Sequence, residues 1–197
     1  MKRIIGITGG IASGKSNISA LLQKKGYSVI DSDQISRNLS QKGNAGYQAI
    51  VEVFGRQILC NDGTINRKVL GNLIFNDEKA RNKLNFAMHP LVINEIKKQI
   101  EALNVDLIFI DIPLLFEAKL EYLCDEILCA YLPYELQIQR LMMRDKIDFV
   151  YADVKIKSQM SLEEKKKKSK YVIDTSGSFE ETEEQLNEIL LKIKGAI

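Results

Sequence analysis

Short runs of β-branched and aliphatic residues alternate along the chain with segments in which apolar residues recur at helical spacing. The run over 3–8 ends in glycines and predicts a buried strand. Helical spacing begins at residue 15 and stops at Gly26, and a second run over 27–30 predicts another strand. A strand, a helix and a strand within about 30 residues form a βαβ unit, which implies parallel pairing of the two strands.

Further β-branched or aliphatic runs continue this pattern and predict strands over 107–110, 126–131 and 171–173. Pro133 suits the first turn of a helix, and Ser178 with Glu181 forms a capping box for a last amphipathic helix. Because strands and helices alternate, we expect an α/β fold with a parallel five-stranded sheet between helical layers.

Two stretches of the chain depart from this alternation. The first contains glycine-rich loops and helical segments over 80–88 and 91–103, which predicts a mostly helical insertion. The second is polar, and its lysines from Lys165 to Lys168 are consecutive, so they would surround any helix and favour a solvated lid. The predicted organisation is a core of 1–38, 105–147 and 171–197, a helical subdomain of 39–104 and a lid of 148–170.

Composition narrows the class of protein. The 197 residues include 28 Lys and Arg against 26 Asp and Glu, and a net charge of +2 argues against a dedicated nucleic-acid binder. Three cysteines without a repeating spacing predict no disulfide framework, which fits a reducing cytoplasm. No apolar run approaches the roughly 20 residues of a membrane span, so no membrane partner is expected.

One glycine-rich segment carries a specific chemical motif. It follows the first predicted strand, opens the first predicted helix and matches the pattern G-x-x-x-x-G-K-[ST]. Glycines let successive backbone N–H groups turn inward and bind phosphate oxygens, and the helix N-terminus adds partial positive charge. Lys15 would reach the β- and γ-phosphates of a nucleotide, and the Ser16 hydroxyl would coordinate Mg²⁺. The predicted nucleotide-binding residues are Gly9, Gly10, Ile11, Ala12, Ser13, Gly14, Lys15 and Ser16.

Carboxylates follow two of the predicted strands. Asp31 and Asp33 come directly after the second strand, at the edge of a parallel sheet where ligands bind. A carboxylate there holds Mg²⁺ or accepts a proton from an attacking hydroxyl. The alternative is a helix cap, with Asp33 capping a helix that starts near Gln34. Asp111 ends the third strand, at the position of a metal-associated Walker-B acid or of an ordinary loop residue.

Two arginines follow the fourth predicted strand. Arg140 and Arg144 lie four residues apart on the polar face of a predicted helix, together with Gln137. Arginines in this arrangement clamp transferring phosphates, although a solvated helix face has the same pattern.

Two classes of phosphate-loop protein compete. A regulatory GTPase needs D-x-x-G followed by N-K-x-D, but residues 82–85 lack the aspartate and residues 174–177 fall in the wrong order. A small-molecule kinase needs an acidic pair after the second strand and an arginine-bearing lid. The residues favour the kinase.

The chain resembles the dephospho-CoA kinase family across nearly its whole length. Beyond the phosphate loop, the most specific shared features are His89-Pro90, the segment Pro-Leu-Leu-Phe-Glu over 113–117, and Gln137 with Arg140 and Arg144-Asp145. Other matching segments are 29–33 with Arg37, Phe54-Gly55, 62–67 and Leu84. A shikimate- or gluconate-type kinase shares the phosphate loop and the acidic pair, but leaves His89-Pro90 and 113–117 unexplained.

The resemblance implies a P-loop NTPase fold with a helical CoA-binding insertion and a lid. It implies transfer of the ATP γ-phosphoryl group to the 3′-hydroxyl of dephospho-CoA by a monomer or small homo-oligomer. It implies that Asp33 is the general base and that Lys15 and Arg140 take part in catalysis. It also implies that Arg140 and Arg144 bind ATP and that Ser16 and Asp31 hold Mg²⁺. The residues that it implies on the acceptor side are Asp33, Arg37, His89, Leu114 and Phe116. The chain has Lys155, Lys170 and Thr175 where members of the family often have Arg, Asp and Asn.

Overall fold

A computed structural model describes residues 2–195 of the chain, with the backbone alone described at 75 and 76. It divides into two compact units. The first unit comprises Met1–Ile30 and Val105–Ile197, and the second comprises Asp31–Asn104. Residues 31–38 therefore group with the second unit, whereas the sequence placed them with the core. The further separation of a lid over 148–170 stays a prediction.

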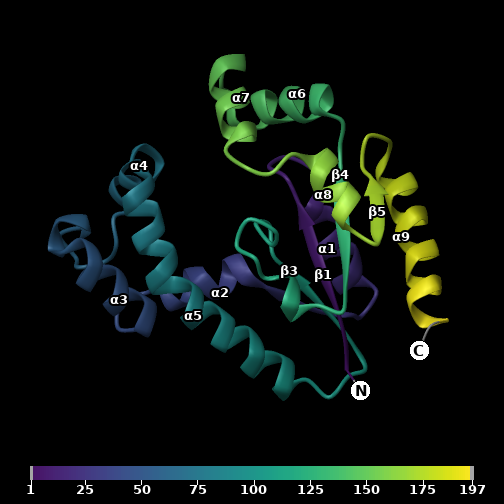
Figure 1. Ribbon diagram of the computed structural model, residues 1–197, viewed down its shortest axis with the longest axis horizontal. Helices are drawn as coiled ribbons and strands as arrows, with labels where there is room; N and C mark the ends of the chain where they lie inside the picture. The colour runs from purple at the N-terminus through teal and green to yellow at the C-terminus, as the bar shows by residue number, and fades with distance from the viewer. Residues whose placement is uncertain (1, 196–197) are drawn as a thin grey trace. The chain divides into compact units, whose positions relative to one another are not determined.

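A parallel five-stranded sheet organises the first unit, as the alternation of strands and helices predicted. The strand order is β2-β3-β1-β4-β5, so β1 lies at the centre (Figure 1). Its register pairs Ile5 with Phe109 of β3 and Thr8 with Cys129 of β4. The strands are β1 (Arg3–Gly9), β2 (Ser28–Asp31), β3 (Leu107–Asp111), β4 (Glu126–Tyr131) and β5 (Tyr171–Asp174).

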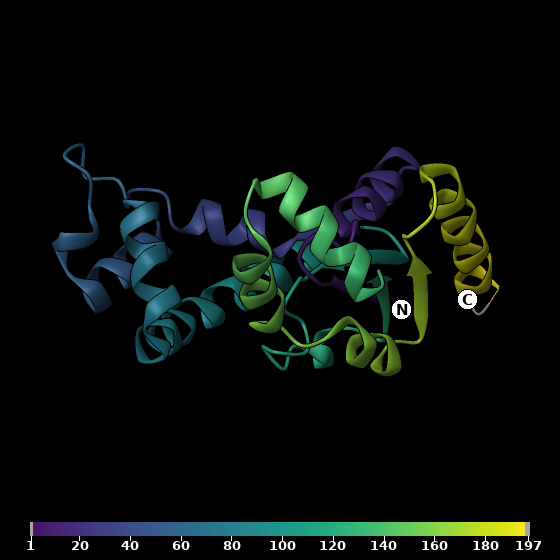
Figure 2. The same ribbon diagram turned by 90° about the horizontal axis from the view of Figure 1, so that it is seen from above.

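Helices α1 (Lys15–Lys24) and α9 (Phe179–Lys194) pack on the same core as the strands, and they lie side by side in Figure 2. Their apolar stripes meet the aliphatic side chains of the strands, including Ile5, Ile7 and Phe109, all of them fully buried. The predicted capping box at Ser178 and Glu181 is confirmed at the start of α9.

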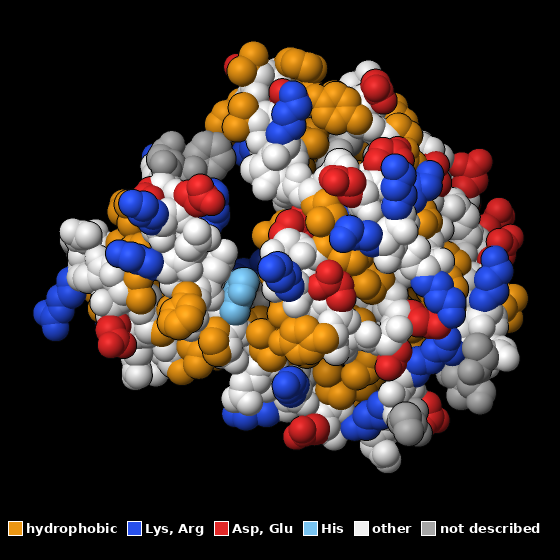
Figure 3. All heavy atoms as spheres, viewed as in Figure 1, with side chains coloured by type: hydrophobic (Ala, Val, Ile, Leu, Met, Phe, Trp, Pro, Cys, Tyr) orange, Lys and Arg blue, Asp and Glu red, His pale blue; other side chains and the backbone are white. Residues whose placement is uncertain are grey.

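Helix α8 (Leu162–Lys168) packs on the sheet through a separate core cluster, in which Leu162 meets Cys129 and Tyr131. Next to it, α6 (Tyr134–Asp145) and α7 (Phe149–Lys157) form a further cluster with the phosphate-loop residues Ile11 and Ala12. The loop is thus packed against α6 and α7 from outside the sheet. Several large apolar side chains of these two helices are exposed: Met143 of α6, and Phe149, Val150 and Val154 of α7. Hydrophobic side chains gather at the top of Figure 3, where Figure 1 places α7.

The second unit is helical, as predicted for the insertion. Its core includes Ile50, Phe54, Leu70 and Met88. The two helices expected over 80–88 and 91–103 form one helix, which continues through Pro90. Proline removes one backbone N–H donor, and the buried Met88 and Ile96 on either side anchor the helix against the loss. The elements are α2 (Ser32–Leu39), α3 (Ala45–Phe54), η1 (Arg56–Ile58), α4 (Arg67–Asn76) and α5 (Glu78–Ala102), while η2 (Glu121–Leu123) belongs to the first unit.

The helices of residues 2–195 are short or carry many polar residues. None of the helices found there combines the length and the apolar character that crossing a bilayer requires.

Candidate active site

The phosphate loop connects the central strand β1 to α1, which is the setting that its sequence motif predicted. Ser13 N–H donates to the Gly10 carbonyl at 3.2 Å and closes the turn. Gly14 has φ of 79° at the N-cap of α1, in the left-handed region that favours glycine. Ala12 adopts φ of 59°, an uncommon conformation for a residue with a side chain. A strained backbone of this kind is held in place by the surrounding structure.

Side chains from distant segments hold the backbone of this loop. Gln137 Nε2 donates to the Ile11 carbonyl at 2.8 Å, and Gln159 Oε1 accepts from the Ile11 N–H at 2.8 Å. The Thr175 hydroxyl donates to the Ser13 carbonyl, also at 2.8 Å. The loop contributes only backbone atoms to these contacts. They therefore fix the path of the loop backbone and leave the N–H groups on its inner side available to a ligand.

A buried ion pair lies at the base of the loop. The Lys15 ammonium pairs with one oxygen of Asp111, and the Ser19 hydroxyl donates to the other at 2.6 Å. The Asp111 side chain is only 7% exposed. Asp111 therefore orients the lysine of the motif and lies beside the first turn of α1, which fits the position of a Walker-B acid.

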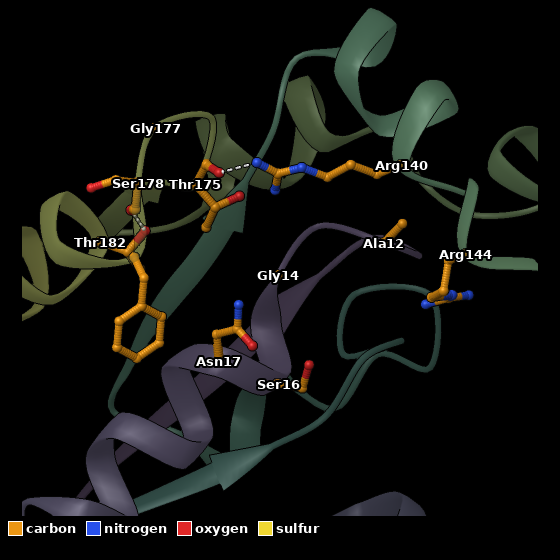
Figure 4. A pocket seen from close by; sticks show the side chains of 11 residues that line it. Ala12, Gly14, Ser16, Asn17, Arg140, Arg144, Thr175, Gly177, Ser178 and Thr182 are labelled. Atoms are coloured by element: carbon orange, nitrogen blue, oxygen red, sulfur yellow. Dashed lines mark hydrogen bonds between the residues drawn. The ribbon is translucent and has the colours of Figure 1, made fainter. Parts of the chain in front are cut away.

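A cavity of about 350 Å³ opens beside the loop, between α6 and the segment that follows β5 (Figure 4). Ala12, Gly14, Ser16 and Asn17 line it from the loop and α1, Arg140 and Arg144 from α6, and Thr175, Gly177, Ser178, Phe179 and Thr182 from the other side. Arg140 extends to the Thr175 carbonyl and donates to it at 2.7 Å. The cavity thus combines a helix N-terminus with two arginines, which favours a polyphosphate ligand.

Arg144 shares a carboxylate partner with Lys155. Its guanidinium donates to Asp145 at 2.8 Å, and Lys155 from α7 donates to the same carboxylate at 3.0 Å. The hydrogen bond from Arg144, followed by that from Lys155, lowers the pKa of Asp145 to about 2. Lys155 therefore has a defined partner in α6, although it differs from the arginine often found in the family.

The carboxylates after β2 have different local roles. Asp31 is the N-cap of α2: its Oδ1 accepts from Gln34 N–H at 2.9 Å, and its Oδ2 lies 3.7 Å from Arg37. Asp33 lies in the first turn of α2 and is exposed. The expectation that Asp33 caps this helix is therefore wrong. The helix starts two residues earlier than expected, and the capping position falls on Asp31.

The remaining predicted acceptor residues lie on two elements. His89 is half-buried in α5, and burial lowers the pKa of its imidazole below the ordinary value of 6.5. Leu114 and Phe116 follow β3 in the first unit; Leu114 is exposed, whereas Phe116 is buried.

The sequence missed the residues that shape the loop from outside it. Gln137 was placed on the polar face of its helix, but it is buried, and a Cβ at Gly10 would lie 2.7 Å from its Nε2. Lys165 was assigned to a solvated run, but it is fully buried. Thr175, which differs from the asparagine common in the family, is buried, and its single hydroxyl hydrogen lies within reach of two carbonyls, those of Ser13 and Tyr131. The pairing of β5 with β4 accounts for the contact of Thr175 with Tyr131, whereas the contacts of Gln137 and Lys165 depend on where α6 and α8 pack.

The residues fit a magnesium ion that is held chiefly by phosphates. Among the described residues no group of three or more His, Cys, Asp or Glu side chains is placed to hold a metal by itself. Mg²⁺ commonly takes one or two protein oxygens and completes its shell with water and phosphate oxygens. Ser16, exposed at the cavity, and Asp111 supply oxygens of this kind. The Ser13 hydroxyl, buried and without a protein partner in the described part of the chain, adds a polar atom at the same loop.

The fold and this site define a nucleotide-binding protein of the phosphate-loop class. A family model described as dephospho-CoA kinase matches residues 3–181. A dephospho-CoA kinase of Carboxydothermus hydrogenoformans is 47% identical over 194 residues, covering 97% of this chain and 94% of the relative. The chain belongs to the dephospho-CoA kinase family.

Solved structures agree with this assignment. A structure of a protein from Thermus thermophilus superposes with a TM-score of 0.85 at 31% identity, over 97% of each chain. A dephospho-CoA kinase from Campylobacter jejuni superposes with a TM-score of 0.73 at 30% identity, over 100% of each chain. The predicted fold class and family are both confirmed, and the shikimate- or gluconate-type alternative is set aside.

Proposed function

We propose that this chain transfers the γ-phosphoryl group of ATP to the 3′-hydroxyl of the ribose in dephospho-CoA, which yields coenzyme A and ADP. The observation that carries the proposal is the phosphate loop in its strand-to-helix setting, within a chain that matches the dephospho-CoA kinase model over 3–181. The loop supplies the nucleotide site, and family membership supplies the acceptor.

ATP would lie along the cavity beside the phosphate loop. Its β- and γ-phosphates would meet the N–H groups of residues 12–16 and the Lys15 ammonium, which would exchange part of its pairing with Asp111 for the phosphates. Arg140 and Arg144 line the same cavity and would neutralise the charge that spreads over the phosphoryl oxygens during transfer. The base and ribose would occupy the side formed by Gly177 and Phe179.

A magnesium ion would be held by the Ser16 hydroxyl, with Asp111 or Asp31 as the candidate carboxylate. When bound, it neutralises charge on the β- and γ-phosphates. Both carboxylates already accept hydrogen bonds, Asp31 from Gln34 N–H and Asp111 from the Ser19 hydroxyl. Asp111 is preferred because it contacts Lys15, the neighbour of Ser16 in the motif.

The acceptor hydroxyl requires a base and a binding surface. We assign Asp33 as the base that accepts its proton, and Arg37, His89, Leu114 and Phe116 as residues that shape the acceptor side. Asp33 is exposed in the first turn of α2, so its carboxylate is accessible to a substrate. An in-line displacement would then move the γ-phosphoryl group from ATP to the ribose oxygen, with ADP as the leaving group and the hydroxyl proton passing to Asp33.

We assign the protein to the cytoplasm as a monomer or small homo-oligomer, with ATP and dephospho-CoA as its partners and no nucleic acid. A near-neutral charge and three free cysteines support this assignment.

The test is to measure ADP release from Mg-ATP with dephospho-CoA, shikimate, gluconate or nucleoside monophosphates offered separately. We expect turnover with dephospho-CoA, together with a product that carries one additional phosphoryl group by mass spectrometry. Turnover only with another acceptor would overturn the proposal. Turnover of GTP without any acceptor would point to a nucleotide switch.

A further inference from the structure

Lys165 is a charged side chain in the interior of the first unit. It is 0% exposed, and its ammonium has three acceptors: the Gly9 carbonyl at 3.2 Å, the Pro113 carbonyl at 2.8 Å and Glu117 Oε1 at 2.9 Å. An ammonium has three N–H donors, so its hydrogen-bonding capacity is fully used.

These acceptors belong to two separate functional segments. Gly9 is the first residue of the phosphate loop, whereas Pro113 and Glu117 bound the Pro-Leu-Leu-Phe-Glu segment after β3. The contacts are reinforced on either side. The Thr8 hydroxyl also donates to the Pro113 carbonyl at 3.1 Å, and Met160 N–H donates to Glu117 Oε1 at 3.0 Å.

A gain in stability does not by itself explain why the charged Lys165 side chain is buried here. Burying an ion pair costs desolvation free energy, and apolar replacements of similar size are often as stable or more so. An apolar pair at positions 165 and 117 would avoid that cost, whereas methionine at 165 alone leaves Glu117 and two carbonyls without their donor. The ammonium also constrains geometry. One nitrogen atom bonds three acceptors, which fixes the distance between the backbone at Gly9 and the segment over 113–117.

We propose that Lys165 is a positioning residue that sets the phosphate loop and the 113–117 segment at the separation required for phosphoryl transfer. The inference rests on the proposed function in one respect: the acceptor is taken to be dephospho-CoA, bound partly by 113–117. Misplacing reacting groups by about 1 Å costs roughly 10²-fold in rate. Lys165 acts through its neighbours and does not touch the reacting atoms.

The test compares Lys165→Met and Glu117→Gln with Lys167→Met, which removes the same charge from an exposed position two residues away. For Lys165→Met we expect kcat/KM for dephospho-CoA to fall about 10²-fold, while the Kd of ATP changes less than about threefold. Glu117→Gln keeps the shape of the segment and should lose about tenfold, since a neutral acceptor binds an ammonium less strongly. Lys167→Met should match the wild type.

A second measurement does not depend on the acceptor. Amide hydrogen exchange over 113–119 should accelerate at least about tenfold in Lys165→Met and remain unchanged in Lys167→Met. If wild-type protein fails to phosphorylate dephospho-CoA, the proposed function falls, and the exchange experiment still decides the positioning role. Unchanged exchange over 113–119 in folded Lys165→Met overturns the inference, as does an equal loss of ATP affinity and transfer. If Lys165→Met does not fold, Glu117→Gln decides by both measurements, because Glu117 lies nearer the surface.

Discussion

The side-chain amides of Gln137 and Gln159 bind the carbonyl and the N–H of a single residue, Ile11. One glutamine comes from α6 and the other from the segment after α7, so two segments meet on one residue of the phosphate loop and hold the two peptide groups that flank it. The path of this loop is therefore maintained by its neighbours as well as by its own glycines.

Replacing Gln137 by Leu should leave the partly buried Ile11 carbonyl without its side-chain donor. We expect the free energy of unfolding to fall by about 1–3 kcal/mol, the usual cost of a buried group left without its hydrogen bond. Urea denaturation measures this loss, with the exposed Gln23→Leu as the matched control. Gln159→Leu should cost less, because Gln159 is partly exposed. An unchanged midpoint for Gln137→Leu would contradict the assigned contact.

Lys15→Ala should abolish phosphoryl transfer and leave the fold intact. We expect a loss of at least about 10²–10³ in kcat, because the ammonium is the main charge aimed at the transferring phosphates. Wild-type protein at an ATP concentration of 100 times Kd should gain about 2.7 kcal/mol of stability, and the variant should gain much less at the same concentration. Thermal unfolding with and without ATP measures the difference. Normal ADP release from folded Lys15→Ala would show that the loop does not bind the phosphates as described.

The variants Asp33→Asn and Asp31→Asn distinguish the proposed catalytic base, Asp33, from the helix cap, Asp31. Loss of a positioned base should lower kcat about 10²–10⁴-fold in Asp33→Asn with little change in stability. Asp31→Asn keeps a capping side chain, so neither kcat nor stability should change much, whereas Asp31→Ala should lose about 0.5–2 kcal/mol of stability. Steady-state kinetics and urea denaturation of the three variants make the comparison. A large loss of kcat in well-folded Asp31→Asn would instead assign Asp31 to the metal.

His89 should make stability depend on pH. Burial lowers the pKa of its imidazole in the folded chain, so the unfolded chain takes up a proton first as the pH falls below 6.5. Stability should therefore decrease from that pH downward and level off once the pH is below the folded pKa. His89 is the single histidine of the chain, so its proton NMR signals report the folded pKa directly. His89→Gln should remove this contribution to the pH dependence of unfolding, and a measured pKa at or above 6.5 would contradict it.

Substrates should protect α7 from proteolysis. A phosphoryl group exposed to water would be hydrolysed, so closure over bound substrates is expected. Trypsin cleavage after Lys155 and Lys157 should slow when ATP and dephospho-CoA are both present. Lys165, already buried, should resist cleavage in either state. The rates are followed by mass spectrometry of the peptides, and unchanged cleavage in α7 would argue against a mobile lid.

Local patterns predicted much of this molecule. The five strands, the first helix and the capping box at Ser178 depend on neighbouring residues, and the structure confirms each of them. The phosphate loop could be predicted equally well, because its glycines and Lys15 lie within one short segment of the chain. Where two local patterns competed, the prediction was wrong. Asp33 was considered as the cap, but Asp31 caps that helix, and the two helices expected on either side of Pro90 form one.

These local patterns could not predict contacts between residues that are far apart in the chain. Gln137 and Lys165 look like surface residues because their immediate neighbours are polar, and their burial depends on where α6 and α8 pack. Gln137 bonds Ile11, 126 residues away in the chain, and Lys165 bonds Gly9, 156 residues away, as well as Pro113, 52 residues away. Spacing within a single helix carries no information about such a partner, whereas the order of strands in the sheet does.

The contacts that hold the phosphate loop have a consequence for synthesis of the protein. They come from residues 126, 148, 156 and 162 positions further along the chain than their partners in the loop. A ribosome therefore makes the nucleotide-binding motif more than 120 residues before the side chains that shape it. The nascent chain carries a complete motif long before it has a complete site, so tight binding of ATP should begin only after Thr175 has emerged.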